Sequence, residues 1–225
     1  MADPFSAQIK AQKLANPPWL DLQLSKEAMD HLWDMINQQG PPPEAGSVLQ
    51  RQASFGGPNN KVNYIEDKDN WFYENVLIQI SEQLYYKDWN NYYNVHIGQS
   101  APPPVFELKL LWVNYQKQHE YISPHNHGAL FSFVVFMKIP THWKEQRALP
   151  WLKNVAESRV SDFQFILGTG MGPVQEIPIP LCPEDEGRIL FFPAWMWHQV
   201  FPFYECEKER ITISGNIILK IKENN

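Results

Sequence analysis

The chain has 225 residues, of which 44% are hydrophobic, and its formal net charge is −6. This length suits one domain over residues 1–225, with enough apolar residues for a sizeable core. The acidic balance argues against nucleic acid as the main partner, because nucleic acids select basic patches. No apolar run is long enough to span a membrane, and the N-terminal residues lack the apolar core of a secretory signal. Because the only cysteines are Cys182 and Cys206, we expect free thiols and a cytoplasmic protein.

Residues 1–100 are expected to form an arm and supporting helices. Residues 1–18 predict a weakly structured arm that ends in two prolines. Residues 25–39 predict a helix, because a serine can cap its start, one face is apolar, and a glycine and three prolines follow it. Residues 41–63 are rich in proline and glycine and predict a long loop. A second helix is predicted over residues 69–89, with a stripe that we interpret as core packing: Trp71, Val76, Leu77, Ile80 and Leu84.

From residue 104 the hydrophobic period changes from that of a helix to that of a strand. Strands are predicted over residues 106–114, 130–139, 163–167, 188–192 and 210–221. The run at 130–139 is almost wholly apolar, so we expect it to be covered on both faces. Helices followed by several strands predict an α+β, mainly β fold, with an antiparallel sandwich or barrel as the core over residues 104–222.

The last predicted strand has one polar and one apolar face, because side chains alternate along a strand. The polar face carries Arg210, Thr212, Ser214 and Asn216, and the apolar face carries Ile211, Ile213 and Ile217. A half-buried strand normally turns its polar face to water. The alternative is that this face lines a cavity in which Arg210 holds an anion. A Pro-His-Asn-His sequence at residues 124–127 favours the cavity.

His125 and His127 point to the same side of an extended segment, at about 7 Å along the backbone. Neutral imidazole suits iron, copper, nickel or zinc. Two histidines alone are weak evidence, so a third ligand is needed, and His198 is the best candidate because it is expected in a turn at the end of a strand. The remaining histidines are less well placed: His31, His96, His119 and His142.

Four motifs in this order resemble one enzyme superfamily: Trp-x-Asn at 112–114, Pro-His-x-His at 124–127, Phe-Pro-x-x-x-x-His at 192–198 and Arg-x-Thr-x-Ser-x-Asn at 210–216. The chain is similar to the iron(II)- and 2-oxoglutarate-dependent oxygenases, and most similar to a branch common in marine bacteria and cyanophages. The resemblance covers residues 106–219, and residues 60–84 show a weaker similarity.

The resemblance implies a double-stranded β-helix, or jelly roll, with the N-terminal helices packed on one sheet. It implies His125, His127 and His198 as metal ligands and Arg210 as the residue that grips the distal carboxylate of 2-oxoglutarate. Thr212 or Ser214 would add a hydroxyl contact, and Asn114 and Asn216 would be polar contacts for cosubstrate or substrate. The cofactors would be Fe(II), 2-oxoglutarate and O2. The implied activity is hydroxylation of a peptide or a small molecule, coupled to oxidative decarboxylation of 2-oxoglutarate.

His127 stands where most of the superfamily has an aspartate or glutamate. This departure leaves open which of the paired histidines binds the metal, and whether iron or zinc is preferred. Two alternatives therefore stay open: a three-histidine, cupin-like metalloenzyme that does not use 2-oxoglutarate, and a non-catalytic jelly-roll interaction protein. Arg210 favours the oxygenase over the cupin-like enzyme. The sequence indicates neither the substrate nor the oligomeric state.

Overall fold

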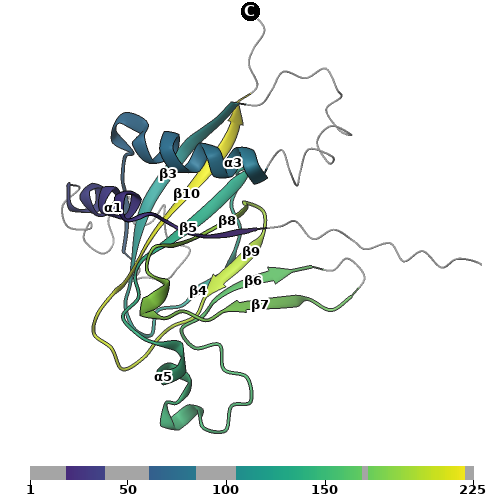
Figure 1. The fold of residues 1–225 in the computed structure, drawn as a ribbon. Coiled ribbons are helices and arrows are strands. Elements are labelled where there is room, and N and C mark those ends of the chain that lie inside the picture. Colours follow the sequence, from purple (N-terminus) through teal and green to yellow (C-terminus); the bar gives the residue numbers. More distant parts are fainter. Residues whose placement is uncertain (1–18, 39–60, 85–104, 169–171, 221–225) are drawn as a thin grey trace, which may run out of the picture.

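The computed structural model describes residues 19–38, 61–84, 105–168 and 172–220, which form two antiparallel β-sheets with helices on the outside (Figure 1). The six-stranded sheet has the order β1 (Leu20–Gln23), β8 (Arg188–Pro193), β5 (Phe131–Lys138), β10 (Arg210–Lys220), β3 (Val105–Gln116) and β2 (Lys61–Tyr64). The four-stranded sheet has the order β4 (Ile122–His125), β9 (Trp197–Val200), β6 (Phe163–Leu167) and β7 (Gln175–Ile179). The predicted mainly β class is confirmed.

Two helical segments cover the outer face of the six-stranded sheet (Figure 1). The first is α1 (Lys26–Gln38), which begins where predicted because the hydroxyl of Ser25 accepts a hydrogen bond from the amide of Ala28 at 3.2 Å. The second comprises the 3-10 turn η1 (Lys68–Asn70), the π-helical segment η2 (Tyr73–Leu77) and α3 (Ile78–Leu84). The carboxylate of Asp67 accepts hydrogen bonds from the amides of Phe72 and Tyr73, a cap that sequence reasoning missed. Residues 85–89 of the second predicted helix lie outside the described residues, as do residues 1–18 and most of the predicted loop at 41–63.

The core has two parts, one on each face of the six-stranded sheet. Between the helices and the sheet lie aliphatic and aromatic side chains from both: Leu32, Ile36, Phe72, Leu77, Val113, Phe131, Val135, Ile213 and Ile217. Between the two sheets lie Val134, Phe136, Phe163, Phe165, Leu190 and Phe192. Strand β5 contributes alternate residues to each part and is buried from Phe131 to Met137, so the expectation that its apolar run is covered on both faces is confirmed.

Several short elements were not predicted. Strand β2 begins at Lys61, inside the stretch that was predicted as a loop, and β9 contains His198, which was predicted to lie in a turn. Strands β1, β4, β7 and helix α5 (Trp143–Arg147) are also short. Elements of four or five residues carry little periodicity, so most of them are defined by pairing or packing in the assembled fold and not by local sequence. No helix among the described residues is long and apolar enough to cross a membrane.

Candidate metal centre

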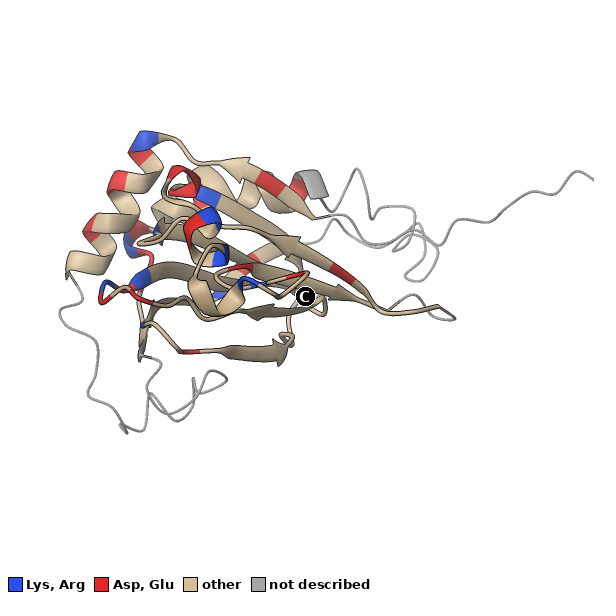
Figure 2. Cartoon of the chain, turned by 90° about the horizontal axis from the view of Figure 1, so that it is seen from below, with Lys and Arg blue, Asp and Glu red and all other residues tan. Residues whose placement is uncertain are grey.

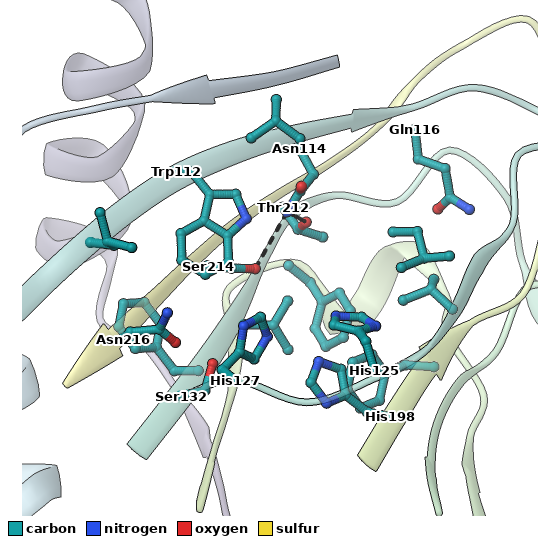
Figure 3. Close-up of a pocket in the computed structure, with 18 of the residues that line it drawn as sticks. Trp112, Asn114, Gln116, His125, His127, Ser132, His198, Thr212, Ser214 and Asn216 are labelled. Atoms are coloured by element: carbon teal, nitrogen blue, oxygen red, sulfur yellow. Dashed lines mark hydrogen bonds between the residues drawn. The ribbon is translucent and has the colours of Figure 1, made fainter. Parts of the chain in front are cut away.

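Three histidines lie close together, one each from β4, the turn that follows it and β9 (Figure 3). His125 ends β4 and lies opposite His198 of β9 in the antiparallel pair. His127 follows in the turn, where its amide donates to the carbonyl of Ala194 at 2.8 Å and so ties this segment to the β8–β9 turn. One ring nitrogen from each histidine lies within 4.8 Å of those of the other two. Such spacing allows three imidazoles to face one ion.

The hydrogen bonds of two of these rings define which nitrogen can bind a metal. Nδ1 of His125 lies 2.8 Å from the carbonyl oxygen of Ser123, and Nδ1 of His198 lies 2.9 Å from that of Met196. A carbonyl oxygen can only accept, so in both rings Nδ1 carries the proton and Nε2 carries the lone pair. A backbone carbonyl that orients the ring through Nδ1 is a common second partner of metal-ligating histidines.

All three imidazoles favour the neutral form. Burial lowers the pKa of His198 well below its usual value, and the nearby His125 lowers it further. Burial, followed by the charge of His125, lowers the pKa of His127 to about 4. Burial also lowers the pKa of His125, although its hydrogen bond to Ser123 acts in the opposite direction. Neutral imidazole is the form that coordinates a metal, so at neutral pH the cluster is ready to bind one.

The polar face of β10 lines a cavity of about 260 Å³ beside the histidines, with Arg210 and Asn216 buried and Thr212 and Ser214 half-buried (Figure 3). Arg210, Thr212, Ser214 and Asn216 all lie along it. Strand β3 pairs with β10 and adds Asn114 directly opposite Thr212. The amide nitrogen of Asn114 donates to the hydroxyls of Thr212 at 3.2 Å and Ser214 at 3.4 Å. The cavity therefore has a hydrogen-bonded polar floor next to the three imidazoles.

Arg210 is 1% exposed, yet no carboxylate contacts it directly among the described residues. Its Nη1 donates to Oε1 of Gln116 at 3.1 Å, and its Nη2 donates to the carbonyl and the hydroxyl of Ser161 at 2.9 and 2.7 Å. The guanidinium lies 5.1 Å from the ring centre of Phe203. Burial lowers the pKa of Arg210 to about 10, while the charge of Asp162 raises it, so the side chain stays cationic at neutral pH.

Sequence reasoning missed Gln116, which lines the cavity, and Ser161, which contacts Arg210. Gln116 lies on the same face of β3 as Asn114, so extending the alternation by one step would have found it. Ser161 lies in an irregular turn with φ of 72° and carried no sequence signal. Of the aromatic residues near the motifs, Phe133 and Phe192 line the cavity, whereas Trp195 and Trp197 are about half exposed and do not.

A second group of potential ligands, His142, Cys182 and Glu184, lies outside the cavity. Nδ1 of His142 accepts a hydrogen bond from the amide of Lys144 and caps α5, so this ring carries its proton on Nε2. A metal on Nε2 would require that proton to move to Nδ1, which would break the cap. Burial and neighbouring carboxyl groups raise the pKa of Cys182 to about 11. This second group is therefore poorly suited to hold a metal.

Comparisons with known proteins agree with this geometry. Residues 110–216, which contain all three histidines and the polar face of β10, match the family model described as "Putative 2OG-Fe(II) oxygenase". No curated protein matches the chain.

The fold is similar to three solved structures of low sequence identity. The non-heme alpha ketoglutarate dependent epimerase SnoN from nogalamycin biosynthesis has 12% identity and a TM-score of 0.52, with 89% of this chain and 77% of that chain covered. The carbocyclase SnoK from the same biosynthesis has 6% identity and a TM-score of 0.52, with 90% and 79% covered. OsALKBH1 has 10% identity and a TM-score of 0.50, with 91% and 100% covered. The predicted double-stranded β-helix is confirmed, and the family model confirms the predicted similarity of residues 110–216 to the iron(II)- and 2-oxoglutarate-dependent oxygenases, a superfamily whose enzymes use Fe(II), 2-oxoglutarate and O2.

Proposed function

We propose that the protein is a hydroxylase in which His125, His127 and His198 hold Fe(II) and Arg210 holds 2-oxoglutarate. The observation that carries this proposal is that one cavity holds three neutral, close imidazoles and a buried cation, Arg210, to which no carboxylate of the described residues bonds. When bound, iron and 2-oxoglutarate supply the oxidative decarboxylation that activates O2 for attack on a substrate C–H bond. The chain itself positions these groups and keeps water out.

The histidines are held by contacts that limit their motion. The ring of Phe163 stacks on His198 with centroids 5.6 Å apart, and Phe192 meets it edge-on at 5.0 Å. Trp112 lies against His127 with centroids 5.7 Å apart. These aromatic walls keep one side of the centre dry, which strengthens the electrostatic interactions inside it.

Arg210 suits the distal carboxylate of 2-oxoglutarate because a guanidinium matches a carboxylate with two parallel hydrogen bonds. Nη1 has a second hydrogen beyond the one given to Gln116, and Nε is buried without a partner among the described residues. Thr212 and Ser214 lie next along the same strand face, so their hydroxyls would contact the ligand between Arg210 and the histidines.

The third histidine changes the charge of the centre. Replacing the usual carboxylate by His127 removes one negative charge, and the bound metal ion would then keep its full charge. Such a centre favours an anionic chelator, and 2-oxoglutarate is one. The departure from the common triad is therefore compatible with the proposed cosubstrate.

The outer part of the cavity favours an uncharged substrate group. Arg210 is the only charged residue among the described lining residues, and the wall away from it includes Tyr64, Leu110 and Trp112. Figure 2 shows that charged residues gather on α1 and the connecting segments, whereas the strands carry few of them. The substrate that fits is a small neutral molecule or an uncharged side chain of a peptide.

A second candidate, a three-histidine, cupin-like metalloenzyme without 2-oxoglutarate, is favoured by one observation. Ser161 already accepts two hydrogen bonds from Nη2 of Arg210, so this arginine has an internal role in the fold. In this case Arg210 would be structural and the cavity would take only the substrate.

An anaerobic titration of the metal-free protein with Fe(II) and then 2-oxoglutarate separates the candidates. We expect the visible charge-transfer band of the iron–keto-acid chelate to appear. Iron binding without this band would support the cupin-like enzyme. Failure to bind iron would support the non-catalytic interaction protein.

A further inference from the structure

Arg210 is a buried cation whose direct partners are all neutral. Its acceptors are the side-chain oxygen of Gln116 and the carbonyl and hydroxyl oxygens of Ser161. Buried charges are normally paired with an opposite charge, because the desolvation of an unpaired ion is costly. The acid whose charge acts on Arg210 is Asp162, which directly follows Ser161 and is itself fully buried.

The carboxylate of Asp162 accepts hydrogen bonds from another arginine, Arg147, and none from Arg210. Nη2 of Arg147 donates to both carboxylate oxygens of Asp162, at 2.9 and 2.6 Å. Asp162 still acts on Arg210 through space, since its charge raises the pKa of Arg210. Three arginines thus act on one carboxylate through their charge, namely Arg147, Arg159 and Arg210, and of these only Arg147 donates hydrogen bonds to it.

Arg147 is fixed from the other side of the ion pair. It ends α5, and its guanidinium lies 4.7 Å from the ring centre of Trp143 at the start of that helix. The preceding Gln146 is buried and exchanges hydrogen bonds with the backbone of Tyr204 at 2.8 and 2.9 Å. Tyr204 follows Phe203, whose ring lies against Arg210. Helix α5 therefore braces the ion pair and the segment that covers Arg210 as one unit.

We propose that Arg147 is a positioning residue that holds Asp162 away from Arg210 and so reserves the charge of Arg210 for a carboxylate ligand. This inference rests on the proposed function, in which that ligand is 2-oxoglutarate. If Arg147 is removed, Asp162 becomes a buried, unpaired acid beside a buried cation. It then pairs with Arg210, and the incoming ligand has to compete with it.

The test is a double-mutant cycle on the affinity for 2-oxoglutarate, measured under anaerobic conditions from the charge-transfer band of the Fe(II)-loaded protein. Arg147→Met removes the guanidinium and keeps an unbranched side chain against Trp143. Charge-assisted hydrogen bonds contribute about 1.5–3 kcal/mol, so this variant should bind 2-oxoglutarate roughly ten- to hundredfold more weakly. The affinity for Fe(II), measured separately, should not change. Arg147→Met/Asp162→Asn should return 2-oxoglutarate affinity to within about threefold of the wild type.

Arg159→Met is the matched control. The side chain of Arg159 is 25% exposed against 26% for Arg147, and its charge also acts on Asp162, but its hydrogen bond goes to the exposed Glu157. Its removal therefore leaves Asp162 bonded to Arg147. This variant should leave the affinity for 2-oxoglutarate unchanged. Equal losses in Arg147→Met and Arg159→Met would overturn the proposal, and so would a double variant as weak as Arg147→Met.

Asp162→Asn alone keeps the test decisive if Arg147→Met fails to fold. The proposal predicts affinity equal to or higher than that of the wild type, because no acid remains to compete for Arg210. A loss of more than about threefold would instead mean that Asp162 itself supports binding, and would overturn it. Arg210→Met distinguishes a failure of the proposed function from a failure of the present inference about Arg147. If that variant binds 2-oxoglutarate normally, the proposed function fails; if it does not, while Arg147→Met binds normally, only the present inference fails.

Discussion

His125 and His198 lie opposite each other in the β4–β9 pair, and each ring donates its Nδ1 hydrogen to the backbone carbonyl two residues earlier in the chain. The two imidazoles are therefore oriented in the same way, and in the proposed metal centre Nε2 would be the coordinating atom of each. This relationship depends on the register of the pair, because a shift of one residue would turn either ring to the other face.

The first prediction concerns His198→Ala. Removing one of three imidazoles leaves too few ligands for stable coordination, so bound Fe(II) should fall from about one ion per chain to almost none. Metal content after dialysis measures this directly. His31→Ala is the control, because His31 packs on Trp71 far from the cavity residues, and it should keep full metal content. Normal iron binding by His198→Ala would exclude the proposed centre.

The second prediction concerns Arg210→Met. This variant fills most of the buried volume but removes the cation, so it should bind Fe(II) as the wild type does. Its affinity for 2-oxoglutarate should fall roughly ten- to hundredfold, because charge-assisted hydrogen bonds to the distal carboxylate are lost. Calorimetric titrations with the metal and then with 2-oxoglutarate give both values. An unchanged affinity for 2-oxoglutarate would show that Arg210 is structural.

The third prediction is a pH dependence of stability caused by Asp162. Burial raises its pKa from 3.8 to about 6, although Arg147 acts in the opposite direction. The folded chain then binds this proton more tightly than the unfolded chain does. The resulting stabilisation is complete below about pH 4 and is lost as the pH rises through about 6.

Asp162→Asn removes this contribution. Relative to the variant, the wild type should therefore lose up to about 1.4 kcal/mol of unfolding free energy per pH unit as the pH rises between about 4 and 6. Urea unfolding of both proteins across this range gives the comparison. Parallel pH profiles would mean that the carboxylate of Asp162 titrates alike in the folded and unfolded chains.

The fourth prediction concerns the packing of β10. A Cβ on Gly215 would lie 2.6 Å from the ring of Phe133 and 2.8 Å from the carbonyl oxygen of Leu110. Gly215→Ala should therefore destabilise the fold by about 1–3 kcal/mol and lower the melting temperature. Gly128→Ala is the matched control, since nothing lies within 4 Å of the added Cβ. Equal melting temperatures for the two variants would contradict the close contact.

The long elements of the fold could be predicted from the sequence because their periodicity is strong. The alternation of β10 defined its polar and apolar faces, and the unbroken apolar run of β5 predicted burial on both sides. The His-x-His spacing also pointed to a shared face, and the structure brings both rings to His198.

The surroundings of Arg210 could not be predicted in this way. Ser161 lies in a turn without periodicity, and it contacts Arg210 only because the fold brings residues 49 positions apart together. Strand β9 has four residues, so the local sequence around His198 could not distinguish a strand from a turn. The contacts of Arg210 and the pairing of β9 form only in the assembled sheets, so no local sequence pattern predicts them.

One face of β10 lines the cavity and the other packs in the core under the helices, and this limits which insertions and deletions the strand can tolerate. Inserting or deleting one residue between Arg210 and Ile217 would exchange the faces on one side of the change, placing isoleucines in the cavity and polar side chains under the helices. The register irregularity against β3 lies between Asn216 and Ile217, just beyond the last polar cavity residue of the strand. An engineer who wishes to resize the cavity should therefore substitute side chains within β10 and confine any change of length to the connecting turns.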